Sequence, residues 1–405
     1  MEGFFTLEQT QSKSRPNGKL VSCASCGLST NCLSPKIPPF GKFKKWIMII
    51  GEAPSDIDDR VGNPWQGKAG KLLEKTLLNL GIDLFEDCVS INSCNCRPTE
   101  NRTPTNHEVD CCRYHVLKAI EEYMPQVIIP LGNSAIYSLL GHRWKKELEG
   151  INKWRGWTIP DQDLKAWVCP TYHPSFVMRG GIEDAPETIW IQDLERAISM
   201  IKIPFLKYKE PKIEVIEDLS ILNDITSDLI SFDYETTGIK PQAEGHRIIC
   251  ASVADTPNHA YVFLMPRTKR NRKPFLDLLS DPRIGKMAHN MKFEDTWSNV
   301  RLKTEVNNWN WDSMLASHVL DNRTGITGLK FQTYVNFGVI DYDSEISSFL
   351  HSNEKGGNEM NTVMKLIEIE EGRNKLLHYC ALDSIFEYRL AMKQIKIMDY
   401  TFLPF

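Results

Sequence analysis

Four cysteines, one close pair and two farther along, constrain this chain more than any other feature. Cys23 and Cys26 form a Cys-x-x-Cys pair, and Cys112 follows Cys96 by sixteen residues. The chain holds 11 cysteines, an odd number, and the polar residues 9–19 do not resemble a signal peptide. Without export, such cysteines indicate metal ligands rather than disulfides. We therefore expect thiolates from separate loops to converge on a metal centre, an iron–sulfur cluster rather than disulfides.

Composition sets the size and the class. With 405 residues, 41% of them apolar and 25% charged, the chain predicts a globular protein of two domains. A net charge of −4 excludes a uniformly basic nucleic-acid coat, so DNA contacts must come from local patches. The basic runs at 42–45 and 267–273 are candidates, although such runs are more often solvated loops. No apolar stretch predicts a membrane span, and we expect a cytoplasmic protein, of a cell or of a virus-infected host.

The first half alternates buried strands with helices. Apolar residues 46–50 end in Gly51 and residues 127–131 end in Gly132, which is typical of parallel strands that lead into functional turns. Helical periodicity covers residues 71–80, 108–123 and 185–201. This pattern predicts an α/β/α layered domain with a central parallel sheet. Ligands gather at the carboxyl ends of such strands, where the turns at Gly51 and Asn92 fall.

A second alternation begins after a break. We divide the chain into a loose extension (1–19), a first domain (20–203), a linker (204–211) and a second domain (212–405). In the second domain three strands in succession precede helices, which predicts an RNase H-like α/β fold with a mixed sheet. Those strands cover residues 229–233, 247–254 and 259–265. No polymerase palm or fingers follow before Phe405.

Several short motifs of the first half occur together in one order. They are Gly51-Glu-Ala-Pro54, Gly62-Asn-Pro-Trp65, Asn92 before Cys96-Arg-Pro98, and His173-Pro-Ser175. From Cys23 to Met200 the set resembles the family-4 uracil-DNA glycosylases. The chain departs from that family at three positions: Ser55 replaces a glycine, Trp65 a phenylalanine and Thr99 a proline.

The resemblance implies a [4Fe–4S] cluster held by Cys23, Cys26, Cys96 and Cys112. Zinc is the alternative, because thiolates alone do not choose the metal. Cys111 adjoins Cys112 and is an alternative ligand. Three further thiols, Cys32, Cys88 and Cys94, are interpreted as buried and inert.

The resemblance also assigns roles in excision of a flipped uracil. Trp65 stacks on the base, Asn92 reads its Watson–Crick edge, and His173 donates to the uracil oxygen that gains charge. Glu52 and Asp58 position the attacking water or stabilise the cationic sugar, and the sequence does not decide between them.

Val177 and Met178 lie where the family places an apolar wedge that fills the gap left by the flipped base.

The second half carries a pattern of carboxylates. Asp233 and Glu235 are two residues apart on a predicted strand, so both face one side. Tyr379 and Asp383 are four apart on a predicted helix and also share a face. Glu294 lies between these motifs. Converging carboxylates of this kind hold the two metal ions that hydrolyse phosphodiesters.

From Pro211 to Met398 the pattern resembles the DEDD exonucleases of the tyrosine subclass, such as proofreading domains of A-family DNA polymerases. The resemblance implies that Asp233, Glu235, Glu294 and Asp383 hold two Mg²⁺ or Mn²⁺ ions and that Tyr379 orients or activates the attacking water. Glu294 stands where the family has aspartate; Asp295 and Asp312 are the alternatives.

The whole chain is thus interpreted as a bifunctional hydrolase for DNA repair or replication. It would excise uracil and trim 3′ ends beside a separate DNA polymerase, as one subunit of a split replicative enzyme. The alternative hypothesis is a uracil-DNA sensor in which only the exonuclease is catalytic. Substituting Asn92 separates the two.

Overall fold

The computed structural model describes residues 21–179, 185–351 and 359–398. The predicted loose extension at 1–19 lies outside these residues. The chain divides into two compact units, Met1–Lys207 and Tyr208–Phe405, and the division falls inside the segment predicted as the linker. No helix within the described ranges is long and apolar enough to cross a membrane.

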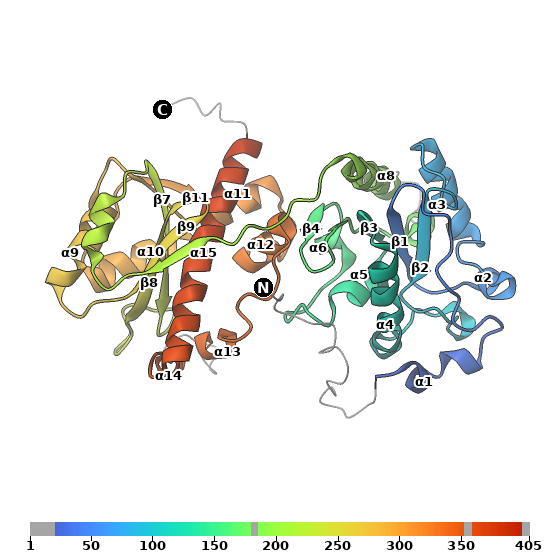
Figure 1. Ribbon diagram of the computed structural model, residues 1–405, viewed down its shortest axis with the longest axis horizontal. Helices are drawn as coiled ribbons and strands as arrows, with labels where there is room; N and C mark the ends of the chain where they lie inside the picture. Colours follow the sequence, from blue (N-terminus) through green and yellow to red (C-terminus); the bar gives the residue numbers. More distant parts are fainter. Residues whose placement is uncertain (1–20, 180–184, 352–358, 399–405) are drawn as a thin grey trace. The chain divides into compact units, whose positions relative to one another are not determined.

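The first unit is built on a five-stranded sheet of order β2-β1-β3-β5-β4, parallel except for the edge strand β4 (Figure 1). Its strands are β1 (Ile47–Gly51), β2 (Cys88–Asn92), β3 (Val127–Pro130), β4 (Ile159–Asp161) and β5 (Ala166–Val168). Every residue of β1, β2 and β3 is buried, because helices cover both faces of the sheet.

The helices of this unit are α1 (Cys23–Cys26), α2 (Asp56–Val61), α3 (Lys68–Asn79), α4 (Asn106–Tyr123), α5 (Asn133–Leu140), α6 (Ile151–Trp154), α7 (Pro174–Arg179) and α8 (Ala185–Ser199). Leu73 of α3 and Trp190 of α8 pack with Ile49 of β1 in one hydrophobic core. Helices α4 and α5 pack against each other and contact β2 and β1. The predicted layered α/β domain is confirmed.

The second unit contains a six-stranded mixed sheet of order β11-β10-β7-β8-β9-β6. Its strands are β6 (Lys212–Val215), β7 (Leu229–Thr236), β8 (Ile248–Thr256), β9 (His259–Leu264), β10 (Gly285–Ala288) and β11 (Trp309–Asp312). β7, β8 and β9 form an antiparallel meander, whereas β10 and β11 add in parallel beside β7. The predicted mixed sheet is confirmed.

The helices of the second unit are α9 (Lys269–Ser280), α10 (Met291–Trp297), α11 (Ser313–Leu320), α12 (Leu329–Phe337), α13 (Ser347–Leu350), α14 (Met364–Ile367) and α15 (Glu370–Ile397). The long α15, red in Figure 1, packs across β7, β8 and β9. Phe232 of β7 packs instead with Phe275 of α9 in a separate core. Because side chains alternate along a strand, Asp233 and Glu235 face the α15 side.

Candidate functional site

The first candidate site lies where β1 and β2 end side by side. Gly51 and Asn92 are paired in the parallel register. A side chain at Gly51 would come within 2.2 Å of Asn92 Oδ1 and 2.9 Å of the Trp65 ring. Glycine is therefore required, because only a bare backbone fits against both groups. The strand ends bring together two of the predicted base-binding residues, Asn92 and Trp65.

His173 adjoins these residues, and its hydrogen bonds define its tautomer. The Ser175 backbone N–H donates to Nδ1 over 3.2 Å, so Nδ1 must accept. Burial lowers the pKa of His173 to about 4. The ring is therefore neutral near pH 7, and its proton resides on Nε2. Trp65 stacks on the His173 ring, with 5.7 Å between the centroids and 29° between the planes.

The two candidate acids of this unit, Asp58 and Glu52, differ in the number of hydrogen bonds that their carboxylate oxygens accept. One Asp58 oxygen accepts from both the backbone N–H and the Oγ of Ser55, each over 2.8 Å, and the other accepts from the Gln66 backbone N–H over 2.6 Å. Asp58 thereby caps α2 and fixes the backbone after Trp65. Glu52 accepts one bond, from Ser134 Oγ over 3.3 Å. Burial raises the pKa of Glu52 above its ordinary value.

The two residues predicted as the wedge differ in exposure. Val177 is buried in the core of the first unit, packed with residues such as Leu73. Met178, the next residue of α7, is exposed, as is Phe176. Helical geometry separates neighbouring side chains by about 100°, so only one of the two predicted positions faces outward.

Cysteines from four segments meet beside the first sheet. Cys96 and Cys112 are buried together with Cys94, and Cys26 packs against them. The Lys36 backbone N–H donates to Cys96 Sγ over 3.2 Å, and the Asn95 backbone N–H donates to Cys112 Sγ over 3.4 Å. Such N–H···S bonds are typical of thiolate ligands in iron–sulfur proteins.

The remaining cysteines of this region have other surroundings. Cys111 lies 3.4 Å from Ser25 Oγ and 3.6 Å from His107 Nε2. Cys23 begins helix α1, which packs on α4, and it is partly exposed. A hydrogen bond from Cys94 lowers the pKa of Cys112 to about 7. Cys112, rather than its neighbour Cys111, is thus the thiol packed with Cys26 and Cys96.

The second candidate site is a group of three carboxylates in the second unit. One oxygen each from Asp233, Glu235 and Asp383 lies within 4.8 Å of the others. Burial raises the pKa of Asp233 well above its usual range, and the neighbouring Asp383 raises it further. Burial likewise raises the pKa of Glu235. A divalent cation bound by hard oxygen ligands would relieve this repulsion, so the residues present fit Mg²⁺ or Mn²⁺.

The fourth predicted carboxylate, Glu294, has two alternatives in the sequence, Asp295 and Asp312. Glu294 is 2% exposed, and its Oε2 has no hydrogen-bond partner among the described residues. Asp295 instead accepts from Trp309 Nε1 and Asn299 Nδ2. Asp312 accepts from four backbone N–H groups and caps α11. Glu294 lies outside the group of three, but its pKa is raised, first by burial and then by the charge of Asp233.

Tyr379 is buried beside Asp383, together with two residues that the sequence did not single out. Tyr342 Oη donates to Asp383 Oδ1 over 2.6 Å. Lys330 Nζ donates to the same oxygen over 2.5 Å. Neither residue belongs to a recognisable spacing. Only the fold brings α12 and the loop after it to α15, so no sequence signal would have found them.

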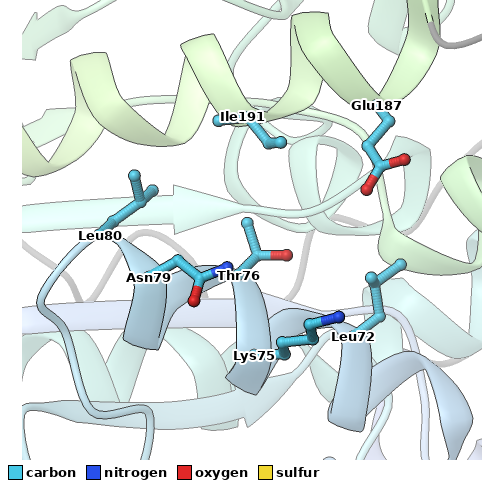
Figure 2. Close-up of a pocket in the computed structure, with 7 residues that line it drawn as sticks. All are labelled: Leu72, Lys75, Thr76, Asn79, Leu80, Glu187 and Ile191. Atoms are coloured by element: carbon cyan, nitrogen blue, oxygen red, sulfur yellow. The ribbon is translucent and has the colours of Figure 1, made fainter.

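Two further features lie outside both sites. The charge of the predicted basic patch at 42–45 is largely compensated, because Lys42 and Lys44 pair with Glu86 and Lys45 pairs with Asp87. Figure 2 shows a pocket of about 150 Å³ in the first unit. It is lined by α3 and α8 residues Leu72, Lys75, Thr76, Asn79, Leu80, Glu187 and Ile191. None of the predicted site residues lines it.

Known proteins match each unit separately. Residues 38–195 match the family model of the uracil DNA glycosylase superfamily, and residues 213–396 match that of the 3′–5′ exonucleases. The type-4 uracil-DNA glycosylase of Thermotoga maritima is 33% identical over 184 residues, which cover 45% of this chain and 92% of the relative. That of Saccharolobus solfataricus is 39% identical over 145 residues, covering 34% and 65%.

A DNA polymerase of Bacillus phage SP01 is 25% identical over 319 residues, covering 70% of this chain and 33% of the polymerase. The matched part of this chain is larger than either unit, so it includes residues of both.

Fold, sites and relatives define a two-domain hydrolase. The chain belongs to the type-4 uracil-DNA glycosylase family through its first unit, which is joined to a 3′–5′ exonuclease domain.

Proposed function

We propose that the first unit excises uracil from DNA by hydrolysis of the N-glycosidic bond and that the second removes nucleotides from 3′ ends with two bound metal ions. The observation that carries the first half is the neutral His173 with its Nε2 proton, next to Asn92 and Trp65. The oxygen of the leaving uracil gains negative charge as the glycosidic bond breaks. A neutral hydrogen-bond donor stabilises that charge and keeps its own proton.

In this scheme Trp65 and Asn92 hold the flipped base and His173 donates to its oxygen. Water forms the new bond to the sugar as the bond to the base breaks, and Glu52 accepts the proton of that water. We assign this role to Glu52 because both Asp58 oxygens already accept hydrogen bonds, one from Ser55 in the α2 cap and the other from Gln66. Asp58 would then act by positioning Trp65. Met178 would fill the vacated stack.

We propose that Cys23, Cys26, Cys96 and Cys112 hold a [4Fe–4S] cluster that stabilises the fold. Four thiolates around zinc lie about 3.8 Å apart, because each Zn–S bond is about 2.3 Å. Within the described ranges no three cysteine sulfurs approach one another within 4.8 Å. This spacing suits a larger group. We also propose a reducing, cytoplasmic location in a cell or an infected host, because free thiols, of which Cys23 and Cys26 are partly exposed, tend to oxidise in other compartments.

For the exonuclease we propose that Asp233, Glu235 and Asp383 hold one ion and that Asp233 and Glu294 hold the second. The unpartnered, buried Oε2 of Glu294 supports this assignment over Asp295 and Asp312. The ions supply charge stabilisation and an activated water when bound. Tyr379 would orient that water from its place beside Asp383.

We propose a DNA polymerase as the partner, since the phage polymerase matches both units together. Co-purification of this protein with a polymerase from the same source would support this proposal. Purification of this protein without any bound polymerase under the same conditions would oppose it. A uracil sensor is the second candidate function. It is favoured by Trp65, which stacks on His173 and whose Nε1 lacks a partner among the described residues.

Substitution Asn92→Ala tests the first proposal. Cutting of a uracil-containing oligonucleotide should fall at least about a hundredfold, while the exonuclease rate stays unchanged. Asn101→Ala, in an exposed turn of the same unit, is the control. Wild-type protein that binds uracil-DNA tightly without forming abasic sites would instead establish the sensor.

A further inference from the structure

Lys330 places a positive charge directly on a predicted metal ligand. Its Nζ lies 2.5 Å from Asp383 Oδ1, and the two side chains are only 19% and 9% exposed. Tyr342 donates to the same oxygen. Asp383 therefore has one oxygen occupied by two donors, while it also belongs to the group of three carboxylates.

Two aromatic rings hold this ammonium in place. It lies 3.8 Å from the ring centroid of Tyr342 and 4.0 Å from that of Tyr379. Both distances are within cation–π range, so the rings stabilise a charge that is partly removed from water. Tyr379 is the residue predicted to orient the attacking water, and Lys330 thus touches both it and Asp383.

Lys286, a buried lysine of this unit, has different partners. Lys286 donates to the backbone carbonyls of Asp281 and Ile284 and closes a loop. Lys330 instead faces ionisable groups of the site and sits on a flexible four-carbon stem. An ammonium on a ligand oxygen competes with a divalent cation for that carboxylate, because both are attracted to the same negative charge.

We propose that Lys330 links metal loading to the arrival of DNA. In the free enzyme its ammonium occupies Asp383 and weakens metal binding. When a DNA phosphate enters, the ammonium moves to the phosphate and leaves Asp383 to the metal. This inference rests on the proposed exonuclease function.

The test is calorimetric titration with Mn²⁺ of the full-length protein that is freed of divalent ions but retains its cluster, with and without a phosphorothioate oligothymidylate that resists cleavage. Lys330→Met should bind Mn²⁺ roughly tenfold tighter without DNA, because removal of a unit charge beside the ion removes repulsion of that order. Wild-type protein should gain Mn²⁺ affinity on adding the oligonucleotide, and Lys330→Met should gain none.

Two further lysine variants and the Asp233→Asn variant serve as controls. Lys330→Arg keeps the charge and should retain weak Mn²⁺ binding, whereas Lys375→Met removes a surface lysine paired with Glu371 and should change nothing. Circular dichroism checks that each variant folds. Unchanged or weaker Mn²⁺ binding in Lys330→Met would overturn the proposal. Equal Mn²⁺ binding by wild type and Asp233→Asn would instead overturn the exonuclease assignment itself.

Discussion

The two sites of this chain use burial in opposite ways. In the first unit burial keeps His173 neutral, with a pKa of about 4, so that the pocket is ready without any added charge. In the second unit burial, and after it the charge of neighbouring carboxylates, raises the pKa of Asp233 and Glu235 beside Asp383, and in our proposal bound cations complete the site. On the proposed assignments, the same physical cost of desolvating charge serves one chemistry that needs no added metal ion and one that depends on metal ions.

The largest expected effect comes from substituting one carboxylate, which should remove one activity and leave the other. Asp233→Asn should lower exonuclease activity by roughly three orders of magnitude or more, because it removes a shared ligand of ions that supply several kcal/mol. Uracil excision should remain at the wild-type rate. Gel assays on a labelled oligonucleotide measure both. Loss of both activities together would contradict two independent sites.

The next largest effect is the reverse, a loss of uracil excision with the exonuclease activity retained. His173→Gln should slow uracil excision by roughly 10²–10³-fold, because it removes a donor to the developing anion. Digestion of 3′ ends should be unaffected. His115→Gln, in the same unit but outside the pocket, is the matched control. Retained excision in His173→Gln would remove His173 from the mechanism.

The pH dependence of excision distinguishes the groups of the first site. Burial raises the pKa of Glu52, so its carboxylate protonates as the pH falls and excision should decline while His173 is still neutral. Single-turnover rates from pH 8 to pH 4.5 measure this decline. Glu52→Gln should abolish the pH-dependent limb along with most activity. A limb that persists unchanged in this variant would exclude Glu52 as the base.

The smallest effect concerns stability rather than chemistry. Arg102 holds the pKa of Glu108 at about 2, below its ordinary 4.5. A depressed carboxyl pKa stabilises the fold above the ordinary pKa, and this contribution is lost as the pH falls toward 2. Glu108→Ala should cost about 1 kcal/mol of unfolding free energy at pH 7, because it also breaks the α4 capping box. Urea denaturation measures it, with exposed Glu121→Ala as control.

The sequence predicted those parts of the sites that follow from local geometry. Asp233 and Glu235 share a face because strands alternate, and Asn92 meets Gly51 because parallel strands end together. The burial of Val177, one of the two predicted wedge residues, was not predicted, because it depends on how α7 packs.

Partners brought together from distant segments were beyond prediction. The bond from the Gln66 backbone N–H to Asp58, and the placement of Lys330 and Tyr342 on Asp383, arise only once the elements pack. The spacing of residues in the sequence does not predict such contacts.

The most direct measurement uses a single-stranded oligonucleotide with one uracil, incubated with the protein in excess EDTA and then treated with alkali. EDTA removes the divalent ions of the exonuclease and leaves the metal-free pocket intact. We predict cleavage at the uracil and no shortening from the 3′ end, with shortening restored by Mg²⁺. An oligonucleotide that stays intact at the uracil would contradict the central claim that the first site is catalytic without added metal.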